Sequence, residues 1–155
     1  MQISAKADYA LRALCVLASS PSGTAVKAGD IAAAQAIPRM FLDTILRDLG
    51  RSGIIESRRG REGGHRLARS CDEITIADVI RATDGPLALI HGQRPESLQY
   101  HDPARHLQDV WVAVRASLRA ILENTTLGQV VSGSLPASVT ALTSDKRSWQ
   151  SPALR

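Results

Sequence analysis

The segment from Lys27 to Leu67 constrains the fold of this chain more than any other part of the sequence. A short polar-faced helix, a tight turn and a second helix with an apolar stripe are followed there by an arginine-rich hairpin with two adjacent glycines. Two helices joined by a short turn form a helix-turn-helix, and a β-hairpin after the second helix adds a wing. The order of these patterns predicts a winged helix-turn-helix.

The boundaries of the two helices follow from local signals. Residues 26–36 are expected to form the first helix around Ile31 and Ala32, and Pro38 begins the second, because proline is favoured at the first helical position. The apolar spacing of the second helix predicts a buried face made of Phe41, Leu42, Ile45, Leu46 and Leu49. Residues 54–58 and 65–68 have strand character, and the glycines between them supply the backbone freedom that a hairpin needs.

The rest of the chain also favours helices. Aromatic residues make up only 3% of the sequence, so the core must consist mainly of aliphatic side chains, which suits packed helices. Ser4 can cap a first helix, and residues 74–82 form another before Asp84-Gly85-Pro86. The expected fold is therefore mainly α with a small β wing, in a DNA-binding domain over residues 1–84 and a connecting loop over 85–102.

The C-terminal part divides into two segments. Residues 103–131 are expected to hold a long amphipathic helix and a following turn. A small winged domain cannot cover its apolar stripe, so a second copy of the chain is the expected partner. Residues 132–155 lack a helical stripe and are expected to be mostly disordered. The predicted dimer interface consists of Leu107, Val110, Trp111, Val114, Leu118, Ile121 and Leu122.

The positive charge is concentrated on the predicted winged domain. The chain has a formal net charge of +4, and residues 39–69 contain eight arginines and four acidic residues. A basic patch of this kind is typical of proteins that bind nucleic acid. The exposed face of the second helix carries side chains that can contact base edges, and the predicted readers are Arg39, Met40, Asp43, Thr44 and Arg47.

The hairpin supplies a second set of candidate contacts. Arginines on a small flexible loop suit a minor groove or a phosphate track, since a narrow groove concentrates negative potential. The predicted wing contacts are Arg58, Arg59, Arg61 and His65. Lys6, Tyr9 and Lys27 are expected to contact backbone phosphates. The glycines are not a P-loop, because no helix with Lys-Ser/Thr follows them.

Several linked motifs resemble those of the bacterial winged-helix regulators that include IscR, NsrR and CymR. The resemblance covers about residues 1–127. It implies a homodimeric transcription factor that binds a dyad-symmetric operator in double-stranded DNA, and we expect this factor to be a repressor. The resemblance also implies that the long helix is the dimer element. The matching stretches include Ala5-Lys6-Ala7-Asp8-Tyr9-Ala10-Leu11-Arg12, Ile37-Pro38-Arg39-Met40-Phe41-Leu42, Arg58-Arg59-Gly60, Gly63-Gly64 and Arg66-Leu67-Ala68-Arg69.

The sequence departs from this family at its cofactor motif. Metal-sensing members carry three cysteines before the dimer helix, whereas residues 87–106 contain none, so the resemblance does not support an iron-sulfur cluster. Gly50 and His65 also replace residues usual in the family. No cofactor is expected. A metal site at His91, His101 and His106, or a redox switch at Cys71, remains an alternative, although the histidine spacings fit no tight metal motif.

Other function classes receive little support. The sequence contains no HExxH motif and no glycine-supported Ser-His-Asp order, so we do not expect an enzyme. No apolar stretch approaches the roughly 20 residues of a membrane span, and the first residues lack the features of a signal peptide, which predicts a cytoplasmic protein with no membrane partner. A winged-helix module that binds a protein instead of DNA is the remaining alternative, and the arginine-rich hairpin argues against it.

Overall fold

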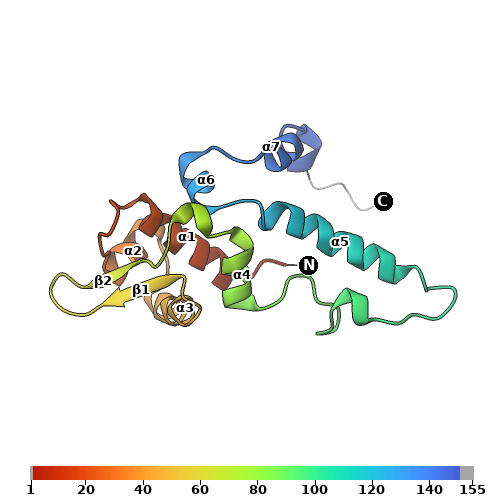
Figure 1. The fold of residues 1–155 in the computed structure, drawn as a ribbon, viewed down its shortest axis with the longest axis horizontal. Coiled ribbons are helices and arrows are strands. Elements are labelled where there is room, and N and C mark those ends of the chain that lie inside the picture. Colours follow the sequence, from red (N-terminus) through yellow and green to blue (C-terminus); the bar gives the residue numbers. More distant parts are fainter. Residues whose placement is uncertain (1, 151–155) are drawn as a thin grey trace.

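The computed structural model describes residues 2–150. In Figure 1 the hairpin forms one end of an elongated molecule, and helix α5 extends toward the other end. Three short 3-10 helices, η1 (Cys71–Glu73), η2 (Pro95–Ser97) and η3 (Lys146–Trp149), lie between or after the main elements. The main elements are α1 (Ala5–Ser19), α2 (Ala28–Gln35), α3 (Arg39–Arg51), β1 (Ile55–Arg58), β2 (Gly64–Leu67), α4 (Ile76–Asp84), α5 (Leu107–Leu122), α6 (Leu127–Ser132) and α7 (Ala137–Thr143). This arrangement confirms the predicted mainly helical fold with a small wing.

Helix α1 lies at the centre of the winged domain. Ser4 caps it as predicted, since its hydroxyl accepts a hydrogen bond from the Ala7 amide at 3.0 Å. The helix contacts α2, α3, α4 and α6, and small alanine side chains on its inner face allow these neighbours to approach closely. Its buried residues are Ala7, Ala10, Ala13, Leu14 and Leu17.

The apolar face of α3 differs from the prediction at one residue. Leu42, Ile45, Leu46 and Leu49 are buried, but Phe41 is 60% exposed. Successive helical residues are rotated by about 100°, so Phe41 lies on the flank of the buried stripe. Its ring instead lies near Tyr9 of α1, with the two centroids 6.3 Å apart. The expectation that Phe41 belongs to the core was wrong.

The wing is a two-stranded antiparallel hairpin whose register pairs Ile55 with Leu67 and Arg58 with Gly64. On the edge of β2 that faces away from β1, Val26 and His65 exchange two backbone hydrogen bonds of 2.8 Å. This close approach requires glycine at position 64, because a Cβ there would lie 2.5 Å from the Val26 carbonyl oxygen. Gly63 is equally restricted, since its Cβ would lie 2.4 Å from the carbonyl oxygen of Arg58.

The end of α5 returns to the winged domain. Thr75 and Thr126 form an isolated β-bridge, and each caps the helix that follows it through a reciprocal capping box. Leu127 is fully buried and belongs to the same core cluster as the residues of α1 and α3. The segment assigned to dimerisation therefore also completes the core of the winged domain.

The expectation of a mostly disordered tail over residues 132–155 differs from the structure. Helix α7 and the turn η3 lie in this segment, and α7 contacts α5. The prediction rested on the missing apolar stripe, but local hydrogen bonds organise the chain here. For example, the Trp149 indole N–H donates to the Thr143 carbonyl at 2.7 Å. Residues 151–155 of the predicted tail lie outside the described residues.

No helix within residues 2–150 combines the length and the apolar character needed to cross a membrane.

Candidate nucleic-acid interface

Helix α3 presents a polar face opposite its buried stripe. All five predicted base readers on this helix, Arg39, Met40, Asp43, Thr44 and Arg47, are exposed. Within residues 2–150, Met40 is the most exposed of the large apolar side chains, at 87%. Charged, hydroxyl and thioether groups therefore lie together on one solvent-exposed face of the helix.

Two of these readers are paired with each other. The Arg39 Nε lies 3.1 Å from the Asp43 Oδ1, one helical turn away. Both side chains are more than half exposed, and ion pairs of this kind contribute little free energy in water. The pair can therefore open at small cost.

The hairpin carries unneutralised positive charge. Arg58, Arg59 and Arg61 are exposed, and none of them forms an ion pair with another residue between positions 2 and 150. Arg66 behaves differently, because its Nη2 lies 2.8 Å from Oε2 of Glu56 on the neighbouring strand. The hairpin and α3 lie beside one another in Figure 1, so the free arginines and the polar face of α3 belong to one end of the molecule.

His65 lies on β2, one residue pair before the hairpin turn, and it is half-buried, unlike the exposed wing arginines. Its Nδ1 is 3.0 Å from the Ser57 hydroxyl on β1. Partial burial lowers the pKa of His65, and the positive charge of Arg39 lowers it further, against an opposing effect of Asp43. The lowered pKa favours the neutral form of the ring.

The three predicted phosphate contacts have different surroundings. Lys6 is engaged within the protein, since its ammonium lies 2.7 Å from Asp48 on α3 and donates to the Thr83 carbonyl at 3.1 Å. The hydrogen bond from Lys6 to Asp48 is the main reason why the pKa of Asp48 is lowered. Tyr9 is half-buried, with the Arg12 guanidinium 5.3 Å from its ring centroid. Lys27 is exposed at the N-cap of α2.

One exposed feature beside α3 was missed in the sequence. A shallow depression of about 610 Å³ lies next to its first turns, with largely apolar walls that include Pro38, Met40 and Phe41. The apolar spacing places Phe41 in the buried stripe. The polar residues Thr44 and Asp48, three and seven positions later, share its side of the helix and are the signal that could have placed Phe41 on the flank.

Helix α5 exposes an apolar face. None of its residues is buried, and Leu107 and Val110 are 40% and 49% exposed. The other predicted interface residues, Trp111, Val114, Leu118, Ile121 and Leu122, are half-buried in the single chain. A groove of about 460 Å³ runs along this face, and it is lined by Val110, Ala113, Val114, Ser117, Leu118 and Ile121.

The alternative sensor residues do not form a common site. His106 lies 3.4 Å from Asp109, and both are exposed. Over residues 2–150 no three histidine, cysteine or acidic side chains, including those of His91 and His101, are grouped so that they could hold a metal ion.

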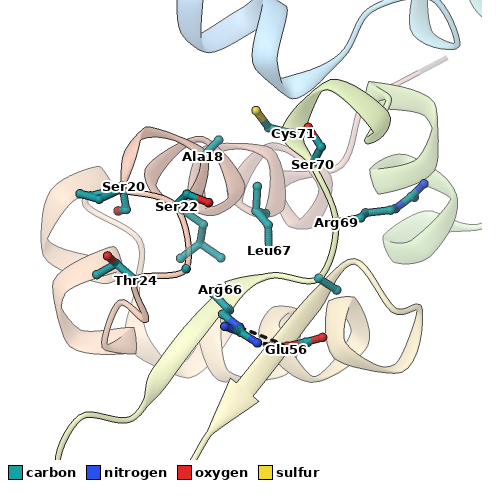
Figure 2. Close-up of a pocket in the computed structure, with 14 residues that line it drawn as sticks. Ala18, Ser20, Ser22, Thr24, Glu56, Arg66, Leu67, Arg69, Ser70 and Cys71 are labelled. Carbon is teal, nitrogen blue, oxygen red and sulfur yellow. Dashed lines mark hydrogen bonds and ion pairs between the residues drawn. The ribbon is translucent and has the colours of Figure 1, made fainter.

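Cys71 lines a hollow of about 660 Å³ at the base of the wing. Figure 2 shows its sulfur turned away from the hollow toward α6, while Arg69 extends toward α4. Arg69 pairs there with Asp78 at 3.3 Å, and Arg66 pairs with Glu56. The polar groups around this hollow therefore do not converge on a ligand.

Comparisons with known proteins agree with the geometry. Residues 3–133 match the Rrf2 family, described as iron-dependent transcriptional regulators. The chain is 50% identical to the HTH-type transcriptional regulator Rv1287 of Mycobacterium tuberculosis over 97% of its own length and 94% of the relative.

Two solved structures are also similar. CymR, the global cysteine regulator of Bacillus subtilis, has a TM-score of 0.73 at 28% identity, covering 85% of this chain and 97% of CymR. The IscR protein of T. potens has a TM-score of 0.70 at 26% identity, covering 86% and 88% of the two chains.

Proposed function

Since the chain belongs to the Rrf2 family of DNA-binding transcriptional regulators, we propose that it is a homodimeric repressor of a dyad-symmetric operator. One observation carries this proposal. The exposed face of α3 and the three wing arginines, which form no ion pair among residues 2–150, lie at one end of the molecule, and α5 with its exposed apolar face extends toward the other. Such a layout lets two chains join at their helices while their wings remain free for DNA.

In this proposal α3 enters the major groove and supplies the base contacts. Arg39 suits guanine, Asp43 can accept from cytosine, and Met40 can contact a thymine methyl. Opening the Arg39–Asp43 ion pair frees both side chains for these contacts. Thr44 and Arg47 extend the same exposed face toward the following bases and phosphates.

The wing supplies the second set of contacts. Arg58, Arg59 and Arg61 bind the adjacent minor groove or phosphate backbone, where their charge displaces counterions. His65 supports the hairpin from β2, where its backbone pairs with Val26 and its ring contacts the Ser57 hydroxyl. Lys27 and Tyr9 contact backbone phosphates at the edge of this surface, and Lys6 joins them only when its ion pair with Asp48 is exchanged for a phosphate.

The dimer forms through α5. Its exposed groove joins the same groove of a second copy, because a self-complementary apolar face is best covered by a two-fold related chain. Two wings and two α3 helices then face half-sites about one helical turn, roughly 34 Å, apart. A dimer held across such an operator blocks access to the promoter, and the protein therefore acts as a repressor in the cytoplasm, where the DNA lies.

We further infer that this regulator works without a cysteine-ligated iron-sulfur cluster. Such a cluster is held by cysteine thiolates, and the whole chain contains only Cys15 and Cys71. Neither lies in the loop before α5, and partial burial raises the pKa of the Cys15 thiol, which disfavours a thiolate. The residues present therefore do not fit the cluster of the iron-dependent relatives.

The proposal is tested by selecting bound sites from fragments of the source genome and footprinting the strongest ones. We expect two protected half-sites related by a dyad, with centres separated by about one helical turn. Protection of a single half-site by a monomer, or equal binding of all fragments at moderate salt, would contradict the proposal.

A further inference from the structure

Four arginines surround one small pocket between the winged domain and α5. Arg81 comes from α4, Arg94 from the connecting loop, and Arg115 and Arg119 from successive turns of α5. Pro86 and Leu87 form an apolar wall, and the pocket volume is about 230 Å³. Guanidinium groups repel one another, so this arrangement requires negative charge nearby.

The carboxylates at this place compensate only part of the charge. Glu123 receives both Arg81 and Arg119, with the Arg119 Nε 2.9 Å from its Oε1, and Glu96 pairs with Arg115. Four guanidinium groups thus face two carboxylates. The pKa of Glu96 is lowered first by a hydrogen bond from its own backbone amide and then by Arg115, and the pKa of Glu123 is lowered by hydrogen bonds from Arg119 and Arg81, so both carboxylates are charged at pH 7.

Arg94 is the arginine left without a carboxylate. It is exposed and forms no ion pair within the part of the chain that the structure describes, although its charge is near enough to Glu96 to lower the pKa of that group. Arg115, by contrast, has only 19% of its side chain exposed. Both Arg94, which is unpaired within residues 2–150, and the largely buried Arg115 line the pocket, so the pocket carries excess positive charge.

This pocket is separate from the predicted dimer interface. Arg115 and Arg119 line the pocket, whereas Val110, Val114 and Ile121 line the apolar groove on another face of α5. Residues at i and i+4 share a helical face, so the two arginines form one stripe and the groove residues another. A ligand in the pocket would therefore leave the groove free for a second chain.

We propose that this pocket binds a small dianion, a compound carrying a phosphate group or two carboxylates. Two uncompensated charges match a dianion, and the planar guanidinium fork binds phosphate and carboxylate oxygens in pairs. Ligand pockets usually have volumes of about 300–1,000 Å³, so this smaller pocket suits a compact anion. The bound anion would bridge α4, the connecting loop and α5.

The proposal is tested by titrating the full chain with sodium phosphate, and separately with succinate, at constant ionic strength balanced with chloride. Calorimetry should give saturable binding at one site per chain, and amide resonances should shift around residues 81–96 and 115–119. Binding of phosphate alone would identify a phosphate compound as the ligand, and binding of both anions would identify dianions in general.

Matched variants separate the pocket from the wing, which also attracts anions. Arg94→Gln should weaken binding about tenfold, the equivalent of one charge-assisted contact. Arg105→Gln removes the same charge from an exposed position outside the pocket and should leave the affinity unchanged. Arg119→Gln serves as a second pocket variant.

Absence of saturable binding, equal effects of Arg94→Gln and Arg105→Gln, or resonance shifts confined to residues 58–65 would overturn the proposal. The titration contains no DNA, so its failure would leave the proposed operator binding untouched.

Discussion

At the scale of single residues, the wing arginines offer the clearest test of DNA contact. Arg59 is exposed in the hairpin turn and has no ion-pair partner among residues 2–150, so its removal disturbs no packing. We expect Arg59→Ala to weaken operator binding markedly and to reduce the slope of log affinity against log salt by about 0.9, the value for one lost phosphate contact. Fluorescence anisotropy over a series of salt concentrations measures both quantities.

Arg105→Ala is the matched control, because Arg105 is exposed far from the wing, where it contacts the neighbouring Asp102 at 3.5 Å and His106 at 3.1 Å. If Arg59→Ala has the same affinity and salt slope as this control, the wing does not contact DNA in the proposed way.

His65 predicts a dependence of stability on pH. Its pKa is lowered in the folded protein, so below its ordinary pKa, about 6.5, the unfolded chain binds more protons than the folded chain. The free energy of unfolding should therefore fall as the pH decreases from 7.5 to 5.5. His65→Gln cannot take up this proton and should lose less stability over the same range, as measured by urea unfolding at each pH.

His101→Gln changes a histidine at an exposed loop position and should follow the wild type. If His65→Gln loses as much stability as the wild type does, the coupling of His65 to the fold is refuted.

At the scale of elements, the wing depends on a glycine that lets two backbone segments touch. A Cβ at Gly64 would lie 2.5 Å from the Val26 carbonyl oxygen, so Gly64→Ala must separate β2 from residue 26. We expect this variant to lose about 1–3 kcal/mol of stability, the usual range for overpacking, and to bind DNA more weakly. Denaturant unfolding measures the stability and anisotropy the affinity.

Gly50→Ala provides the opposite control within α3, because a Cβ at this position meets no atom within 4 Å. It should be neutral or stabilising by about 0.5 kcal/mol, since alanine favours a helix over glycine. Equal stabilities for the two variants would show that the close contact between Val26 and β2 does not contribute to the stability of the wing.

At the scale of the whole molecule, the exposed groove of α5 predicts a dimer. Val110 lines the groove, whereas Val112 is also exposed, at 37%, but does not line it. We expect Val110→Glu to dissociate the dimer because its carboxylate would be buried against a second copy, and Val112→Glu to remain dimeric. Sedimentation velocity distinguishes the two states, and a Val110→Glu variant that still sediments as a dimer would contradict the interface.

Local sequence patterns by themselves determined the helix-turn-helix, the hairpin and the exposed face of α3. Helical period, capping residues and paired glycines act over a few positions, so they can be read without knowledge of the fold. The same locality explains the errors at Phe41 and in the tail. Whether a residue such as Phe41 at the edge of an apolar stripe is buried depends on the neighbouring helix. Helix α7 is organised by hydrogen bonds, which leave no periodic apolar pattern in the sequence.

Only the tertiary structure decided which distant residues meet. It placed Leu127 in the core of the winged domain, engaged Lys6 with Asp48, and paired the backbone of His65 with that of Val26. It also gathered Arg81, Arg94, Arg115 and Arg119 around one pocket. These residues are separated by many positions along the chain, and their approach results from the packing of whole helices, which no local pattern records.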